Sequence, residues 1–192
     1  MCYALNHMGT VLLIAILMIL VVGQIIILLS TVMFIYGNII SSVPLVPVRR
    51  NALNKILEAL ALSDGDKLYD LGSGDGRVLA YALEAEPKIT AIGLEIGPWP
   101  RMLSKIKLRK YGSRVKIVNK DFFKANISDA THIYVYLYPK VLEKLKMVFD
   151  KNLLPGTRVV SCDFPFINKQ PEKIIPVPNS KTISKTLYVY IW

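Results

Sequence analysis

The first 48 residues of this chain of 192 contain no Lys, Arg, Asp or Glu, and this feature restricts the fold more than any other. From Thr10 to Tyr36 the sequence is almost purely aliphatic, with only four small or polar residues inside it. A helix rises about 1.5 Å per residue, so one of this length exceeds the bilayer's hydrocarbon core of about 30 Å. We therefore predict one transmembrane helix over residues 10–36, preceded by an N-terminal tail of residues 1–9.

Two alternatives fit this apolar segment less well. A cleaved signal peptide has a shorter apolar run, basic residues before it and a small-residue cleavage site, none of which is found here. A helix at the surface of a soluble core would carry a polar face. Positive charge begins only after the segment, at Arg49 and Arg50. The positive-inside rule therefore predicts a single-pass membrane protein whose C-terminal part lies on the cytoplasmic or an equivalent side.

The part of the chain after the apolar segment has the composition of an ordinary globular domain. Pro44 and Pro47 disfavour helix, so we expect an extended connector over residues 37–50 and one domain over residues 51–192. About a quarter of residues 49–192 are charged, the usual share in soluble domains. No second long apolar run follows and only two cysteines are present, which excludes a polytopic membrane protein and a disulfide scaffold.

Strand and helix patterns alternate along this domain. Apolar residues at helical spacing predict helices over 51–62, 75–83, 98–111 and 140–150. Short β-branched runs predict strands over 67–71, 88–95, 114–118, 131–138 and 157–164, with a final strand pair over 174–177 and 186–192. Such alternation indicates an α/β fold with a mostly parallel sheet and helices on both faces.

The motif LYDLGSGDGRV, residues 68–78, joins the first strand to the next helix. Glycines there allow positive φ and close approach of the backbone to a ligand, at the strand end where open parallel sheets bind ligands. The spacing is G-x-G-x-G, and Arg77 stands where the dinucleotide fingerprint needs its third glycine. Asp70 would repel a pyrophosphate but pair with a cation. The loop therefore favours a ligand that carries an ammonium and a sulfonium.

The D-x-G-x-G-x-G pattern resembles the first motif of class I S-adenosylmethionine-dependent methyltransferases. The resemblance implies their Rossmann-like fold with a C-terminal antiparallel strand, and S-adenosylmethionine as cofactor. In that family one acidic residue after the second strand holds the ribose hydroxyls, and another after the third strand meets the adenine amino group. The cofactor-binding residues that the resemblance implies are Asp70, Gly72, Ser73, Gly74, Gly76, Glu95, Asp121 and Phe122, the last as a cover for the adenine ring.

Four segments carry a narrower resemblance. The sequences VPLVP at 43–47, YDLGSGDGR at 69–77, DFFK at 121–124 and RVVSCDFPF at 158–166 look like the membrane-anchored protein-lysine methyltransferases of mitochondria and their prokaryotic relatives. The similarity covers roughly residues 40–192 and implies a lysine of a membrane-associated protein as methyl acceptor. The basic stretch after Glu95 and the short C-terminus depart from the family pattern. A small molecule, a lipid or RNA as acceptor, or a non-catalytic nucleotide-binding module, therefore stay open as alternatives.

Residues after the fourth strand are the candidates to line an acceptor site. Methyl transfer from a sulfonium is an in-line displacement, to which an enzyme contributes mainly proximity and alignment. A lysine acceptor must react as the neutral amine, and burial lowers its pKa. We assign Tyr138 and Pro139 to this site, whereas packing explains Tyr136 as well. We predict His132 to be a surface residue. No metal is expected, because the two histidines lie far apart in the sequence.

Residues 101–120 hold eight basic side chains and no acidic one. The simplest interpretation is a solvated face. Beside a membrane anchor, attraction to anionic lipid is a second interpretation, at about 1 kcal/mol per basic residue near the surface. Nucleic acid is the less favoured partner, because no aromatic residues are interleaved in a binding motif. The expected partners are thus a membrane and a protein substrate.

Overall fold

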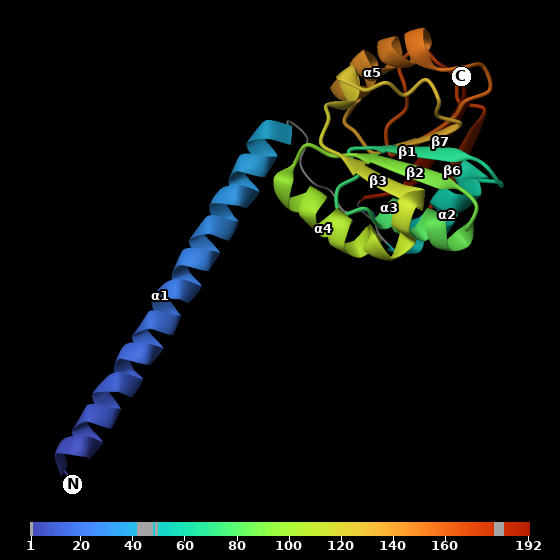
Figure 1. Cartoon of the computed structure of the whole chain (residues 1–192). Helices are drawn as coiled ribbons and strands as arrows, with labels where there is room; N and C mark the ends of the chain where they lie inside the picture. Colours follow the sequence, from blue (N-terminus) through green and yellow to red (C-terminus); the bar gives the residue numbers. More distant parts are fainter. Residues whose placement is uncertain (1, 42–47, 49, 179–182) are drawn as a thin grey trace.

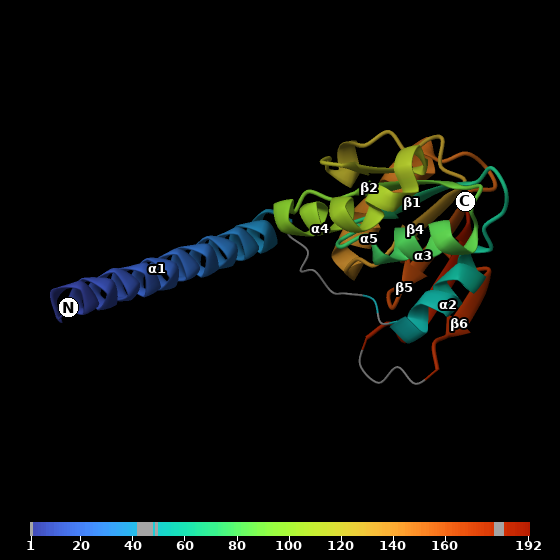
Figure 2. The ribbon, with the colours of Figure 1, turned by 60° about the horizontal axis from the view of Figure 1, so that its bottom comes forward.

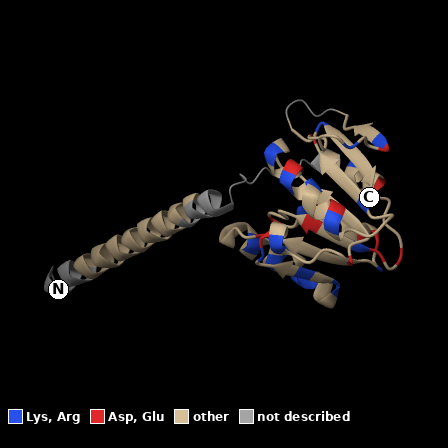
Figure 3. Cartoon of the chain, turned by 90° about the horizontal axis from the view of Figure 1, so that it is seen from above, with Lys and Arg blue, Asp and Glu red and all other residues tan. Residues whose placement is uncertain are grey.

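The computed structural model describes residues 2–41, 48, 50–178 and 183–192. One long helix, α1 (Cys2–Ser41), projects from an α/β domain (Figure 1). The helix contains no charged residue, whereas Lys, Arg, Asp and Glu are distributed over many elements of the domain (Figure 3). The helices of the domain are α2 (Arg50–Leu60), α3 (Arg77–Ala85), α4 (Pro98–Leu108) and α5 (Pro139–Asn152), with 3₁₀ turns η1 (Arg109–Arg114) and η2 (Phe122–Lys124). The strands are β1 (Lys67–Leu71), β2 (Thr90–Leu94), β3 (Val115–Val118), β4 (His132–Val135), β5 (Arg158–Cys162), β6 (Lys173–Pro176) and β7 (Thr186–Ile191).

The seven strands form one sheet in the order β3-β2-β1-β4-β5-β7-β6. The first five are parallel, and β7 lies antiparallel between β5 and β6. The strand order reverses between β1 and β4, which is the switch point where open α/β sheets bind ligands. The predicted fold class, a mostly parallel sheet with a C-terminal antiparallel strand, is confirmed.

Two apolar cores lie on the two faces of the sheet. Helices α2, α3 and α4 cover one face, and α5 covers the other together with the chain's C-terminal aromatic residues (Figures 1 and 2). Successive residues of β1 alternate between these cores, so that Leu68 joins the first while Tyr69 and Leu71 join the second. Because both faces are covered, the central strands are apolar almost throughout, as in other parallel sheets.

The element boundaries differ from the prediction where a neighbouring strand or helix ends. The predicted strand 131–138 pairs only over His132–Val135, because β1 beside it turns into the glycine loop after Leu71. The predicted helix 98–111 ends at Leu108 and continues as η1, in which Gly112 has a φ of 58°.

Helix α1 continues through Ser41, although an extended connector was expected from residue 37. A proline restricts mainly itself and the residue before it, so Pro44 leaves residues 37–41 free to stay helical. The rest of the predicted connector, at 42–47 and 49, lies outside the described residues.

Within α1, Gly9–Val32 is long and apolar enough to cross a membrane. Two hydroxyl groups near its C-terminal end are satisfied inside the helix, since Ser30 Oγ donates to the Ile26 carbonyl at 2.8 Å and Thr31 Oγ1 to that of Ile27 at 2.9 Å. Such internal bonds lower the cost of a polar side chain in lipid. The large aliphatic side chains of this segment are exposed, so it is not a core helix.

Candidate functional site

The parallel register brings the C-terminal ends of β1, β2 and β3 to one edge of the sheet. Leu71 pairs with Leu94, and Leu94 pairs with Val118. Beyond the last pairs, the Gly72 and Ser73 amides both donate to the Leu94 carbonyl, at 2.9 and 3.1 Å. The residues predicted to bind a cofactor therefore meet at this edge: Asp70, Gly72, Ser73, Gly74, Gly76, Glu95, Asp121 and Phe122.

The glycine loop adopts a conformation that other residues would strain. Gly72, Gly74 and Gly76 have φ values of 83°, 55° and 73°. At Gly76 an added Cβ would lie 2.7 Å from Leu108 Cδ1 and 3.0 Å from Ser104 Cβ, both on α4. This glycine thus serves two purposes, since it starts α3 in a left-handed conformation and lets α4 pack closely against the loop.

Asp70 is a buried carboxylate without a partner. The residue is only 3% exposed, and its side chain has no hydrogen bond or ion pair within the described part of the chain. Burial raises the pKa of this carboxyl well above its usual range, and the nearby carboxylates of Glu95 and Asp75 raise it further. A cationic ligand group would compensate all of these effects, because an opposite charge favours the ionised carboxylate.

Glu95 connects the glycine loop to the start of α4. Its Oε2 accepts the Gly74 amide at 2.9 Å and its Oε1 accepts the Gly97 amide at 2.7 Å. A carboxylate offers about four acceptor positions, so roughly half stay free for further donors such as hydroxyls. The residue is buried, at 8% exposure. Glu95 therefore shapes the loop and can still receive a ligand.

Asp121 and Phe122 lie just beyond β3 and are half-buried. Asp121 caps η2, because its Oδ1 accepts the Phe123 amide at 3.0 Å. The rings of Phe122 and Phe123 pack with their centroids 4.7 Å apart. The hydrogen bond from Phe123 thus fixes Asp121 at this edge. The second carboxylate oxygen of Asp121 has no hydrogen bond among the described residues.

Tyr138 and Pro139 form the start of α5. Tyr138 is the N-cap residue and Pro139 the first residue of the helix, where a missing N–H costs nothing. The Tyr138 side chain is 42% exposed and its ring lies 5.8 Å from that of Phe164. Phe164 is half-buried, so the two rings form a partly exposed aromatic pair beyond the C-terminal ends of β4 and β5.

Asp163 is a residue of this region that the sequence did not single out. It has a φ of 63°, unusual for a residue with a side chain. Its carboxylate accepts the backbone amides of residues 184–186 and the hydroxyl of Tyr136, the last at 2.6 Å. These bonds tie β4, β5 and β7 together next to Tyr138. A short polar residue that follows a buried strand was the only signal, and it is a weak one.

One further expectation is corrected. His132 is 9% exposed rather than a surface residue, since it packs at the start of β4 with its Nδ1 2.8 Å from Thr131 Oγ1. Because His132 pairs with Leu68 near the start of β1, it lies at the N-terminal ends of the strands, opposite the glycine loop.

The basic stretch 101–120 is not one free face, because half of its side chains have partners within the domain. Those four are Arg101 on the Ile96 carbonyl, Lys107 on Asp75, Lys110 on Glu84 and Arg114 on the Pro87 carbonyl.

The site fits the groups that S-adenosylmethionine carries. The unpartnered Asp70 carboxylate suits a cation, and the free acceptor positions of Glu95 suit hydroxyl donors. The buried Ser73 hydroxyl also has no hydrogen-bond partner among the described residues, so a ligand could satisfy it. Fold, strand order and glycine loop together define a class I methyltransferase that uses S-adenosylmethionine.

The comparisons with known proteins narrow this class to a family. Residues 70–173 match the family described as ANTKMT methyltransferase domain, and the chain belongs to that family. A protein-lysine N-methyltransferase of Saccharolobus islandicus is 35% identical over 151 residues, which cover 78% of this chain and 93% of the relative. The adenine nucleotide translocase lysine N-methyltransferase of mouse is 32% identical over 135 residues. These residues make up 69% of this chain and 58% of the mouse relative.

Solved structures agree with this placement. A methyltransferase from Salinibacter ruber, described as an RNA methyltransferase in complex with S-adenosyl-L-homocysteine, superposes with a TM-score of 0.69. It is 32% identical, over 76% of this chain and 93% of that structure. The chain is therefore an S-adenosylmethionine-dependent methyltransferase.

Proposed function

We propose that the protein transfers methyl groups from S-adenosylmethionine to lysine side chains of a membrane-associated protein. The buried, unpartnered Asp70 beside the glycine loop is the observation that carries the cofactor assignment. The lysine assignment is supported by the archaeal and mouse relatives, which are named as lysine methyltransferases.

Each predicted residue has a role in this proposal. S-adenosylmethionine, when bound, supplies a methyl group activated by a sulfonium. Asp70 compensates the cofactor's positive charge, and the loop of Gly72, Ser73, Gly74 and Gly76 lets the backbone approach it closely. Glu95 receives the ribose hydroxyls, while Asp121 and Phe122 receive the adenine.

The acceptor site is proposed at the partly exposed aromatic pair of Tyr138 and Phe164, with Pro139 fixing the start of α5 beside it. Aromatic faces attract an ammonium, so they can orient an incoming lysine. Burial against these rings would also lower the pKa of the lysine and yield the neutral amine that attacks the methyl group.

Helix α1 is proposed to anchor the enzyme in a membrane as a single-pass span, with the domain on the cytoplasmic or an equivalent side. The length and apolar character of Gly9–Val32 support the span. The positive charge that follows it supports the orientation. The side chains of the basic stretch without a partner among the described residues, Lys105, Arg109, Lys116 and Lys120, are available to anionic lipid.

Calorimetric titration with S-adenosylhomocysteine and with NAD tests the cofactor assignment directly. We expect binding of the first and none of the second, and the reverse result would contradict the proposal. RNA is the second candidate acceptor, because the similar Salinibacter structure is described as an RNA methyltransferase. Transfer of labelled methyl groups into membranes, followed by separation of protein, RNA and lipid, distinguishes these acceptors.

A further inference from the structure

Helix α4 has an apolar stripe on the side that faces away from the domain. Met102 and Ile106 are 43% and 67% exposed, and Trp99 is partly exposed. These three residues lie at positions i, i+3 and i+7, hence on one helix face. Ser104 and Leu108, on the opposite side of the helix, are buried against the domain. Helix α4 therefore has two apolar faces, one of which has no partner in the domain.

Basic side chains border the apolar stripe. Lys105 and Arg109 are exposed and make no ion pair with any described residue. Lys107, on the other border, is paired with Asp75. An exposed apolar face that contains Trp and is bordered by Lys and Arg is typical of helices that lie in the interface of an anionic membrane.

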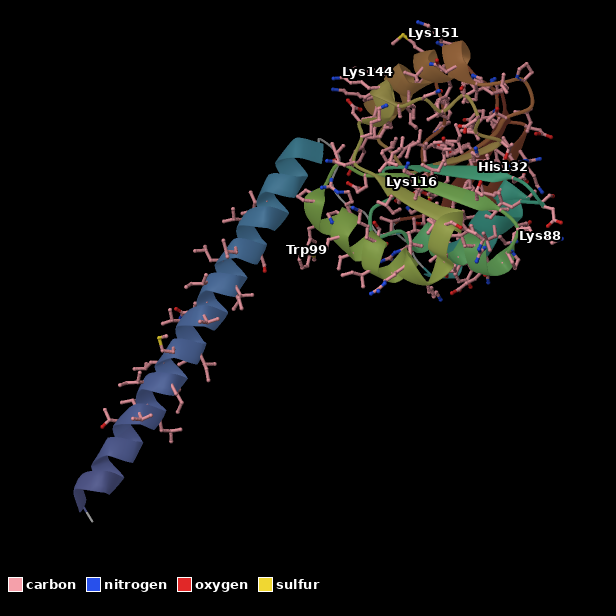
Figure 4. All side chains as sticks on the ribbon, in the orientation of Figure 1. Lys88, Trp99, Lys116, His132, Lys144 and Lys151 are labelled. Carbon is pink, nitrogen blue, oxygen red and sulfur yellow. The ribbon has the colours of Figure 1, made fainter. Side chains whose placement is uncertain are left out.

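Helix α4, which carries the stripe, begins next to both helix α1 and the cofactor edge of the sheet. The C-terminal end of α1 approaches the start of α4 (Figures 1 and 2). Trp99 projects there at the outer side of the domain (Figure 4). Helix α4 begins only four residues after β2 ends, and the Gly97 amide before it is bound by Glu95. The C-terminal end of α1, the start of α4 and the proposed cofactor site are thus close together.

We propose that the stripe of Trp99, Met102 and Ile106 inserts into the headgroup region of an anionic membrane and holds the cofactor edge of the sheet at the membrane surface. The inference rests on the proposed anchoring by α1 and deepens the proposed function. It predicts that acceptor lysines lie within or next to the headgroup layer. Lysines of soluble domains far from the membrane would then be out of reach.

Met147, the most exposed apolar side chain of α5, does not belong to such a stripe. Met147 on α5 is 68% exposed, but its neighbours Leu145 and Phe149 face the core and α5 covers the opposite face of the sheet. Met147 therefore offers a control of similar size and exposure to Ile106, on helix α5, which covers the opposite face of the sheet from α4 (Figure 1).

The two tryptophans of the chain allow a direct test. The full chain is reconstituted in phosphatidylcholine–phosphatidylglycerol vesicles with brominated acyl chains, which quench nearby indoles. In W192F the only indole is Trp99, and we expect it to lose fluorescence relative to vesicles with unbrominated lipid. In W99F the only indole is Trp192, which packs against Phe149 and Phe166, and we expect no loss.

Polar substitutions then test the stripe itself. In the W192F background, replacing Met102 and Ile106 together by Ser should reduce quenching of Trp99, whereas Met147→Ser should leave it unchanged. An unquenched Trp99 would overturn the inference. A second copy of the chain that covers the stripe would give this result, because it would keep Trp99 away from the lipid.

Two further observations distinguish a failure of this inference from a failure of the proposed anchoring or of the lysine assignment. Release of the chain from membranes by alkaline carbonate would overturn the anchoring, and the insertion with it. Quenching of Trp99 needs no methyl transfer, so the inference would survive a failure of the lysine assignment.

Discussion

Replacing Asp70 by Asn should stabilise the free protein and weaken cofactor binding. In the free protein the folded-state pKa of Asp70 is raised, so the folded state binds more protons than the unfolded chain and loses stability as pH rises above about 4. Each unit of raised pKa costs about 1.4 kcal/mol at neutral pH. For a domain of this size 1 kcal/mol corresponds to about 2–4 °C in Tm. We therefore expect a higher Tm in Asp70→Asn than in the unsubstituted chain at pH 7.5, and a smaller fall of Tm as pH rises.

The same substitution removes the charge that the proposed cofactor site offers to a cation. A hydrogen bond to a charged group contributes about 1.5–3 kcal/mol, which corresponds to a loss of about 10- to 150-fold in affinity for S-adenosylmethionine. Differential scanning calorimetry and isothermal titration in one detergent measure both effects. Asp64→Asn is the control, since Asp64 forms only an exposed pair with Lys88 and should change neither quantity. A lower Tm together with unchanged affinity would refute this account of Asp70.

Three more substitutions test other parts of the site and the fold. Gly76→Ala places a Cβ against Leu108 and should destabilise the domain by about 1–3 kcal/mol, measured by thermal unfolding, and an unchanged Tm would show that α4 can shift without cost. Tyr136→Phe removes the hydrogen bond to Asp163, so KM for the acceptor should rise while affinity for S-adenosylhomocysteine stays constant. If affinity for S-adenosylhomocysteine fell by the same factor as KM rose, Tyr136 would have a general structural role instead. Burial lowers the pKa of His132, so folded stability should fall as pH drops below about 6.5, and His132→Gln should flatten that decline in pH-dependent melting curves.

The fold and most of the cofactor edge could be predicted because their signals are local. Strands such as 67–71 are short apolar runs that end at glycines, and parallel strands place their C-terminal ends together. Asp70, Glu95 and Asp121 follow or end three such strands, so their grouping follows from strand order alone.

Features that depend on distant partners could not be predicted. The contacts of Lys107 with Asp75 and of Arg114 with the Pro87 carbonyl join residues about thirty positions apart, so the basic stretch looked uniform in the sequence. Asp163 takes its importance from amides more than twenty positions later. The continuation of α1 past residue 37 has no local signal either, since Gly37 and Asn38 are compatible with helix but do not favour it.

Transfer of labelled methyl groups from S-adenosylmethionine into membranes tests the central claim most directly. After incubation with the full chain, the membranes are separated into protein, RNA and lipid, and the protein is hydrolysed to amino acids. We predict that the label is recovered as methylated lysine, and that Asp70→Asn reduces it. Label found only in RNA or lipid, or methylated amino acids other than lysine, would contradict the proposed function.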